Sequence, residues 1–136
     1  MNRGVIRSAA FCLALCVAGC GSSNTVRVTG SLLKGGQRLR IEDGQWIQMS
    51  LHPVEGDPTK AETFPANVTP DGKFEVTGKE GAGIPRGKYR VAVRLVKYKA
   101  REDDAFKNAF DSANSPIIKQ IDGPTSFDVD VEKPAG

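Results

Sequence analysis

Thiols and imidazoles are scarce in this sequence. Its three cysteines, Cys12, Cys16 and Cys20, all lie within the first twenty residues, and His52 is the only histidine. Residues 21–136 therefore cannot form a disulfide, a thiolate metal site or a cysteine nucleophile. A zinc site or an imidazole-based catalytic site would need a second histidine or a thiol near His52. We therefore expect no metal, no cofactor and no enzymatic activity.

Net charge is also low. The sequence has 19 Lys and Arg against 16 Asp and Glu, and two of the basic residues, Arg3 and Arg7, stand at the N-terminus. Without these two the balance is 17 to 16, so charge gives no support for a nucleic-acid partner. The apolar stretch at residues 8–18 is too short to span a bilayer comfortably. Following two arginines, it instead predicts the hydrophobic region of a signal peptide.

The targeting segment ends in Val-Ala-Gly-Cys at residues 17–20. This ending resembles the lipobox of bacterial lipoproteins, in which an aliphatic and two small residues precede an acylated cysteine. The resemblance implies cleavage between Gly19 and Cys20, loss of residues 1–19, and acyl chains such as palmitate on Cys20. Several acyl chains hold a protein stably at a membrane without a spanning helix. In such lipoproteins an Asp directly after the cysteine favours retention at the inner membrane, so Gly21 implies, by the same resemblance, the outer membrane of the cell envelope. An ordinary secretory signal with a chance cysteine is the alternative.

The mature chain is predicted to be one domain. Residues 20–24 carry the lipid and a polar tether, residues 25–133 form the domain, and residues 134–136 are a tail. Alternating polar and apolar residues predict strands at residues 25–33, 45–52, 62–69, 73–77, 88–98, 117–121 and 126–132. Pro65 predicts an edge position for the third of them. Short strands separated by frequent turns predict an all-β fold, a seven-stranded antiparallel β-sandwich.

Residues 100–113 break this alternation. Phe106, Ala109, Phe110 and Ala113 follow a helical spacing, which predicts one short helix with an apolar stripe. The acidic residues 102–104 would stand at its first turn, where they favour the helix dipole. That role is preferred for them over calcium binding, because the spacing of a calcium loop is missing.

A second acidic group lies on the last predicted strand. Asp128, Asp130 and Glu132 alternate with apolar residues and share one face. They are a candidate cation site, but pairing with Arg90 and Arg94 on the outward face of residues 88–98 is the preferred interpretation. For neither acidic group is a metal site the preferred interpretation.

Two aromatic residues are expected on outward faces. Trp46 and Tyr98 fall on the polar side of their predicted strands, and outward aromatic rings can stack on sugars or contact proteins. They are therefore a candidate binding surface. Cover by residues 100–113 is the alternative explanation.

Three short motifs carry a resemblance to a known domain. They are Val26-x-Val28-x-Gly30, Asp71-Gly72-x-Phe74 and Gly87-x-Tyr89-x-Val91-x-Val93. Their order and spacing are similar to the carboxypeptidase regulatory-like, or transthyretin-like, domain, and in particular to small lipoproteins of planctomycete-type bacteria. The resemblance implies an Ig-like sandwich without chemistry of its own. Hydroxyisourate hydrolase shares the general fold, but it uses several histidines and a C-terminal Tyr-Arg-Gly-Ser, which this chain lacks.

These observations predict a lipid-anchored lipoprotein of the cell envelope, on its periplasmic or surface side, with a non-catalytic domain. The domain would be a structural or protein-binding module with an unidentified envelope partner. A carbohydrate- or peptidoglycan-binding module that uses Trp46 is the alternative, and a small hydrolase comes third. A contiguous aromatic-lined groove would favour sugar, a flat exposed patch would favour a protein, and a deep polar pocket would reopen catalysis.

Overall fold

The computed structural model describes residues 24–98 and 100–133. The predicted signal peptide, the cleavage position after Gly19, the acylated Cys20 and the tail at residues 134–136 lie outside these residues and stay predictions. Within the described part, no helix is long and apolar enough to cross a membrane.

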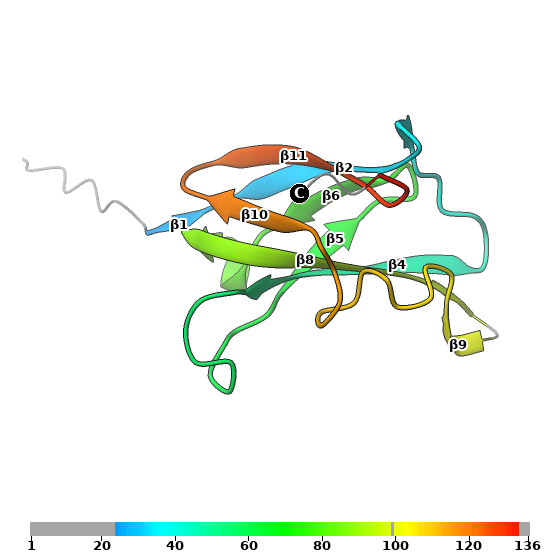
Figure 1. Ribbon diagram of the computed structural model, residues 1–136. Coiled ribbons are helices and arrows are strands. Elements are labelled where there is room, and N and C mark those ends of the chain that lie inside the picture. Colours follow the sequence, from blue (N-terminus) through cyan, green and yellow to red (C-terminus); the bar gives the residue numbers. More distant parts are fainter. Residues whose placement is uncertain (1–23, 99, 134–136) are drawn as a thin grey trace, which may run out of the picture.

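The described chain is nearly all β (Figure 1). Its strands are β1 (Thr25–Val26), β2 (Val28–Lys34), β3 (Gln37–Arg38), β4 (Gln45–Pro53), β5 (Phe64–Val68), β6 (Lys73–Val76), β7 (Ile84–Pro85), β8 (Gly87–Lys97), β9 (Ala100–Asp104), β10 (Ile118–Ile121) and β11 (Thr125–Asp130). A single 3-10 turn, η1, spans Lys79–Gly81. Seven strands form one path of hydrogen-bonded neighbours in the order β10-β8-β4-β5-β6-β2-β11. These correspond to the seven predicted strands, so the all-β sandwich is confirmed.

The path curls into two layers whose apolar faces meet. β10, β8 and β4 form the first layer, and β6, β2 and β11 form the second, drawn above β8 and β4 in Figure 1. The buried side chains alternate along each strand, as period two requires; they include Met49, Leu51, Val91 and Val93 in the first layer and Val28, Leu32, Phe74, Val76 and Val129 in the second. Each such side chain contributes about 1.5–3 kcal/mol on full burial.

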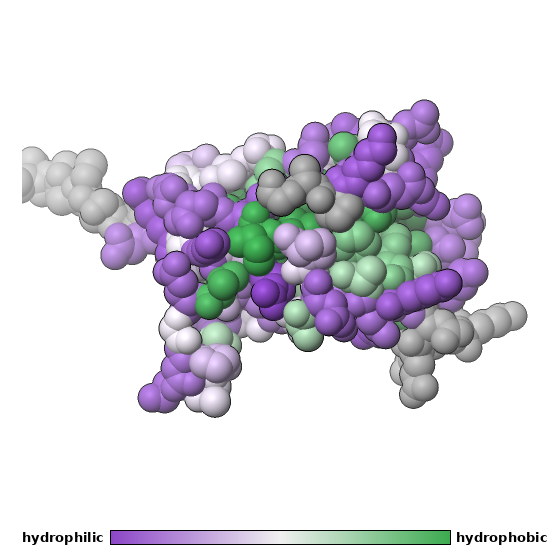
Figure 2. Space-filling model, viewed as in Figure 1, coloured by the Kyte–Doolittle hydropathy of each residue, from purple (hydrophilic) through white to green (hydrophobic). Residues whose placement is uncertain are grey.

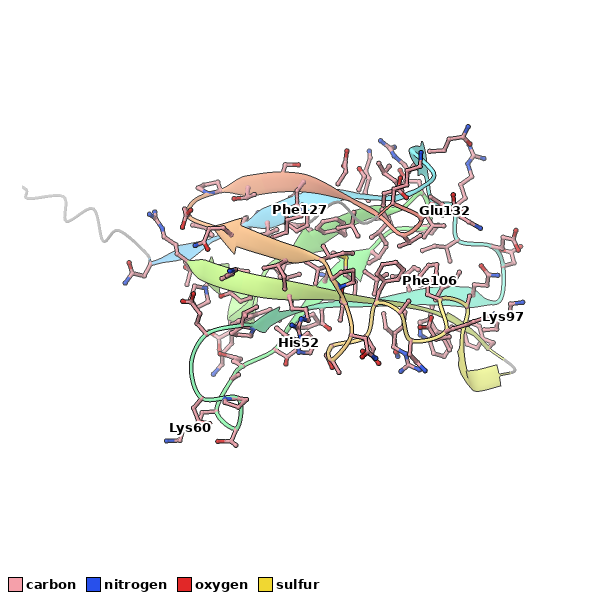
Figure 3. The ribbon with its side chains drawn as sticks, viewed as in Figure 1. His52, Lys60, Lys97, Phe106, Phe127 and Glu132 are labelled. Carbon is pink, nitrogen blue, oxygen red and sulfur yellow. The ribbon has the colours of Figure 1, made fainter. Side chains whose placement is uncertain are left out.

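The side between β10 and β11 is closed by side chains. The path of paired strands ends at these two strands, and Figure 2 shows an apolar band between the layers, bordered by polar residues. The labelled rings of Phe127 and Phe106 lie between the layers (Figure 3). The ammonium of Lys119 lies 5.5 Å from the centre of the Phe127 ring and covers part of it. In the described chain, the two layers are therefore joined on this side by side-chain contacts and not by a pair of hydrogen-bonded strands.

The predicted edge position of residues 62–69 is wrong. β5 lies inside the path, with Phe64–Ala66 opposite β4 and Asn67 and Val68 opposite β6. Each half of β5 thus has one partner strand, and the strand passes from one layer to the other at this corner. Pro65 lies in the half that pairs with β4, opposite Ser50. It is tolerated because no second strand needs a backbone N–H from this residue.

One pair of strands departs from the predicted antiparallel arrangement. β11 runs parallel to β2, from Thr125 opposite Val28 to Asp130 opposite Leu33. The preceding link, from Ile121 to Thr125, joins strands of different layers. Because this link does not form a hairpin, β11 is not required to pair antiparallel with β2.

The predicted short helix at residues 100–113 is also wrong. β9 occupies the beginning of this segment, turns follow, and Lys107 and Asn108 have positive φ angles of 53° and 61°. The buried Asp104 carboxylate takes the amides that a helix would use: Oδ1 accepts from Phe106 at 3.1 Å and Oδ2 from Asn108 at 3.0 Å. Such side-chain acceptors compete with the helical pattern. The Phe106 and Phe110 rings still meet edge to face, 5.7 Å apart.

Candidate functional site on the outer face of β4 and β8

The outer face of β4 and β8 carries a row of mostly polar residues that point away from the core. β4 and β8 pair antiparallel along their length, and the pairs on this face are His52 with Arg90, Ser50 with Ala92, Gln48 with Arg94, and Trp46 with Val96. The residues between them face the core. One continuous surface therefore joins Trp46 at one end to His52 at the other.

Trp46 and Tyr98 are brought together at the beginning of β4 and the end of β8. Their ring centres lie 4.9 Å apart with the planes at 83°, an edge-to-face arrangement. The Tyr98 amide donates to the Gly44 carbonyl at 2.9 Å, which holds the residue beside β4. Tyr98 is 65% exposed and Trp46 is half-buried. The predicted outward position of both rings is confirmed, and cover by residues 100–113 does not account for Tyr98.

This aromatic pair lies far from the N-terminal end of the domain. Lys97, the neighbour of Tyr98, is at the end of the sandwich opposite β1 (Figures 1 and 3). Beside Tyr98 is a hollow of about 370 Å³ whose polar walls come from Glu42, Asp43, Gln45 and Lys97. The rings are thus bordered by groups that donate and accept hydrogen bonds. We call Trp46, Tyr98 and this hollow the aromatic surface.

A polar pocket of about 440 Å³ lies over the middle of the same face. Its floor is formed by β4 and β8 through Gln48, Ser50, His52, Ala92 and Arg94, and its wall by the loop residues Asn108, Asp111 and Ser112. Below, we call it the polar pocket.

The wall of the polar pocket is held by backbone contacts. Arg90 Nη1 donates to the carbonyls of Ser112 and Ala113 at 3.3 and 3.1 Å. Asp111 Oδ1 accepts from the amides of Ala113 and Asn114 at 3.0 and 2.7 Å. The loop is therefore fixed over β8 before any ligand arrives.

His52 lies on the outer side of the first layer (Figure 3) and contacts two hydroxyl groups. Its Nε2 is 2.8 Å from Ser50 Oγ, and its Nδ1 is 3.3 Å from Thr63 Oγ1. Burial, and then the positive charge of Arg90, lower the pKa of His52. The imidazole is therefore neutral near pH 7, so one ring nitrogen accepts a hydrogen bond while the other donates.

The contact between Ser50 and His52 is the feature that sequence reasoning missed, since it placed His52 as a solvent-facing residue at a strand end. Spacing of two residues on one strand face was the available signal. Serine hydrolases pair a serine and a histidine in this way, but a carboxylate orients their imidazole and stabilises its charged form. Here the hydroxyl of Thr63 takes that position. The expectation of a non-catalytic domain stays a prediction.

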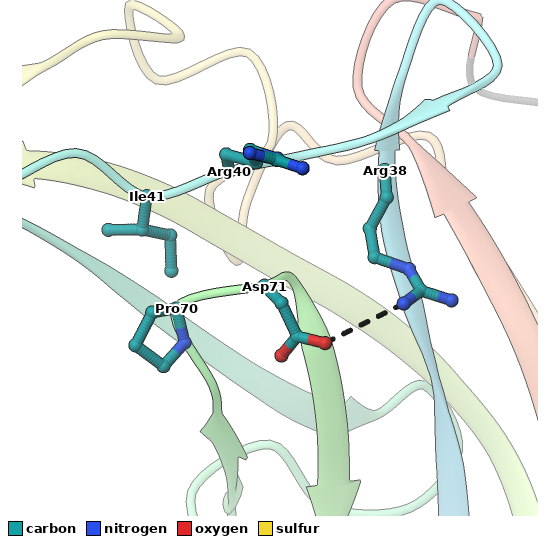
Figure 4. A pocket seen from close by; sticks show the side chains of 5 residues that line it. All are labelled: Arg38, Arg40, Ile41, Pro70 and Asp71. Carbon is teal, nitrogen blue, oxygen red and sulfur yellow. Dashed lines mark ion pairs between the residues drawn. The ribbon is translucent and has the colours of Figure 1, made fainter.

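A further hollow, of about 570 Å³, is lined by Arg38, Arg40, Ile41, Pro70 and Asp71 (Figure 4). Asp71 forms ion pairs with Arg38 at 3.6 Å and with Lys73 at 3.9 Å. The Thr69 hydroxyl first, then the charges of Lys73 and Arg38, lower the pKa of Asp71. These exposed contacts hold two connections together, because the Ile41 amide also donates to the Pro70 carbonyl. We interpret this hollow as structural.

The predicted pairing of the carboxylates on the last strand with Arg90 and Arg94 is wrong. Asp130 instead accepts four backbone N–H groups, from Gly35 at 3.0 Å, Gly36 at 2.7 Å, Glu132 at 2.9 Å and Lys133 at 3.2 Å. These contacts, led by that from Glu132, lower the pKa of Asp130. In the described residues, no group of three or more His, Cys, Asp or Glu side chains could hold a metal ion.

No protein-family model, no curated protein and no solved structure matches this chain. The site is therefore interpreted from its own chemistry.

Proposed function

We propose that this protein is a lipid-anchored lipoprotein of the cell envelope whose β-sandwich is a non-catalytic, protein-binding module of the carboxypeptidase regulatory-like type. The anchor is supported by Val-Ala-Gly-Cys at residues 17–20, after a basic start and a short apolar stretch. The outer membrane is the preferred location, by the same resemblance.

The observation that carries the binding function is the position of the aromatic surface. β1 begins at Thr25, so a lipid on Cys20 would hold that end of the domain within roughly 15–20 Å of the membrane, given about 3.5 Å for each extended residue. The aromatic surface is at the opposite end. An anchored domain would therefore present Trp46 and Tyr98 away from the membrane, where a partner can reach them.

The chemistry of this surface fits a protein partner. Protein interfaces are enriched in tyrosine and tryptophan at their centre and have a polar rim. The exposed ring of Tyr98, supported by Trp46, would provide the centre, and Glu42, Asp43 and Lys97 would provide the rim.

A glycan is the second candidate, and the hollow beside Tyr98 favours it. A sugar needs an aromatic face and nearby hydrogen-bonding groups, and Glu42, Asp43 and Gln45 provide such groups next to the ring. The partner would then be a cell-wall carbohydrate such as peptidoglycan.

A photo-crosslinking amino acid at position 98 tests the protein-binding function in intact cells. We expect a discrete crosslinked protein, identified by mass spectrometry, which disappears when Trp46 is replaced by alanine. The same crosslinker at Val54, an apolar residue that is 43% exposed elsewhere, is the matched control and should not yield this product. Co-sedimentation of the purified protein with peptidoglycan, lost in Tyr98→Ala, together with no protein crosslink, would support the glycan instead.

The anchor is tested separately. Cys20→Ser should release the protein from membranes or leave it unprocessed, whereas Cys16→Ser, a change within the predicted signal peptide, should leave anchoring intact. Membrane fractionation and the mass of the N-terminal peptide measure this. Unchanged fractionation of Cys20→Ser, with no lipid mass on the wild-type peptide, would contradict the proposal.

A further inference from the structure

The polar pocket contains a guanidinium group with no partner. Arg94 lines its floor, and no ion pair or hydrogen bond joins the Arg94 side chain to any described residue. The buried Nε–H groups of Arg94 and of Arg90 both lack a hydrogen-bond acceptor. A buried donor without an acceptor lowers the stability of the folded protein. A ligand that pairs with the guanidinium would offset part of this loss.

The charge around the pocket is positive. Among the lining residues, Arg94 carries a positive charge and Asp111 a negative one. Arg90 does not line the pocket, but its guanidinium is bound to the wall through the carbonyls of Ser112 and Ala113 and adds a second positive charge beside it. Both carboxylate oxygens of Asp111 already accept hydrogen bonds, Oδ2 from Asn114 Nδ2 at 3.1 Å and Oδ1 from two backbone amides. Asp111 is thus occupied within its own loop and is not paired with Arg94.

Gln48 provides a second polar group beside the guanidinium. It is exposed and lies directly opposite Arg94 in the β4–β8 register, so the two side chains emerge about 5 Å apart on one face. The exposed Asn108 amide faces them from the wall. A volume of about 440 Å³ lies within the range of small-molecule sites.

We infer that the polar pocket binds the carboxylate of a small organic acid, with Arg94 as the ion-pair partner and the amides of Gln48 and Asn108 as hydrogen-bonding groups. A guanidinium presents a planar fork that matches a carboxylate. Together with Arg90 beside the wall, the site carries a net charge of about +1, so a monoanion fits it better than a phosphate dianion, which Asp111 would repel more strongly. This inference concerns a site separate from the aromatic surface and does not rest on the proposed function.

The test uses the full-length protein in non-ionic detergent at constant ionic strength. Sodium lactate and N-acetylglycine are the probes, lactamide is the uncharged analogue, and inorganic phosphate is the competing anion. Binding is followed by NMR through the side-chain amide signals of Gln48 and Asn108 and the Nε–H signal of Arg94. We expect saturable shifts with at least one carboxylate and no comparable shifts with lactamide.

Substitutions of Arg94 test whether its guanidinium forms the ion pair with the carboxylate. Arg94→Gln should weaken carboxylate binding at least tenfold, while Arg86→Gln, which changes an exposed arginine outside the pocket, should leave it unchanged. If Arg94→Gln does not fold, Arg94→Lys keeps the charge and removes the fork, and it should weaken binding severalfold. The inference is overturned if neither carboxylate binds, if lactamide or phosphate binds as tightly, or if the Arg94 variants bind like the wild type.

Discussion

Gly30 of β2 lies directly opposite Phe74 of β6, and the Phe74 ring occupies the space that a side chain on Gly30 would need. A Cβ atom at this position would lie 2.6 Å from Phe74 Cζ and 1.8 Å from the carbonyl oxygen of Phe127. Phe127 lies on the other side of Gly30, in β11. Its ring centre is 5.4 Å from that of Phe74. The missing side chain lets two rings from different strands meet over β2.

Gly30→Ala should therefore destabilise the fold. Overpacking of this kind costs about 1–3 kcal/mol, and we expect the upper part of that range because one clash is with backbone. Urea unfolding of the chain that begins at residue 21 measures it. Gly123→Ala, where no atom lies within 4 Å of the added carbon, is the control and should change stability by less than about 0.5 kcal/mol. Equal effects of the two substitutions would contradict the packing described for Gly30.

Val93 and its neighbour Arg94 test the register of β8. Val93 is fully buried, so Val93→Ala should leave a cavity and cost about 1–3 kcal/mol. Arg94 is on the outer face without an ion pair, so Arg94→Ala should cost about 0–1 kcal/mol. Urea unfolding of both variants shows which one loses more unfolding free energy. A larger loss for Arg94→Ala would mean that the two faces of β8 are exchanged.

Asp104 should be important for stability. Its carboxylate accepts from the amides of Leu95, Phe106 and Asn108, and Asp104→Ala would leave all three without this partner. An unsatisfied backbone N–H costs about 1–3 kcal/mol when it is buried, and these three contacts are only part-buried, so we expect a total loss of about 1–3 kcal/mol in thermal or urea unfolding. Asp104→Asn keeps one acceptor oxygen, so its stability should lie between those of the wild type and Asp104→Ala. Asp128→Ala, at an exposed position, should have little effect. A loss no greater than that control would disprove this role.

His52 should make stability depend on pH. Burial and Arg90 lower its pKa in the folded state, so the unfolded chain, with a pKa of about 6.5, binds the proton more readily. The contribution of His52 is therefore complete above pH of about 6.5 and is lost as the pH falls through that value toward the folded pKa. His52→Gln should flatten the unfolding free energy between about pH 7.5 and 5.5, where ordinary side chains other than histidine do not titrate. Since His52 is the only histidine, an unchanged slope would contradict the lowered pKa.

Much of the fold follows from local pattern. Alternation along residues such as Val91 and Val93 shows which side of each strand is buried, because successive side chains point to opposite faces wherever the strand lies. All seven predicted strands exist for this reason. The same alternation placed Trp46 and Tyr98 on the outer side, and the targeting segment is likewise a local signal.

Contacts between distant residues needed the tertiary structure. Alternation does not say which strand lies beside which, so the interior place of β5 and the parallel pairing of β11 with β2 depended on the packing of two layers. The spacing of Phe106 and Phe110 is compatible with a helix, but the buried Asp104 carboxylate took the amides that a helix needs. The polar pocket exists because a loop is fixed over β8. The alternation of side chains along a strand is set by the local backbone, so the sequence alone predicts it. Strand order, loop position and the acceptor of each amide depend on residues that are distant in the sequence and meet only in the folded chain.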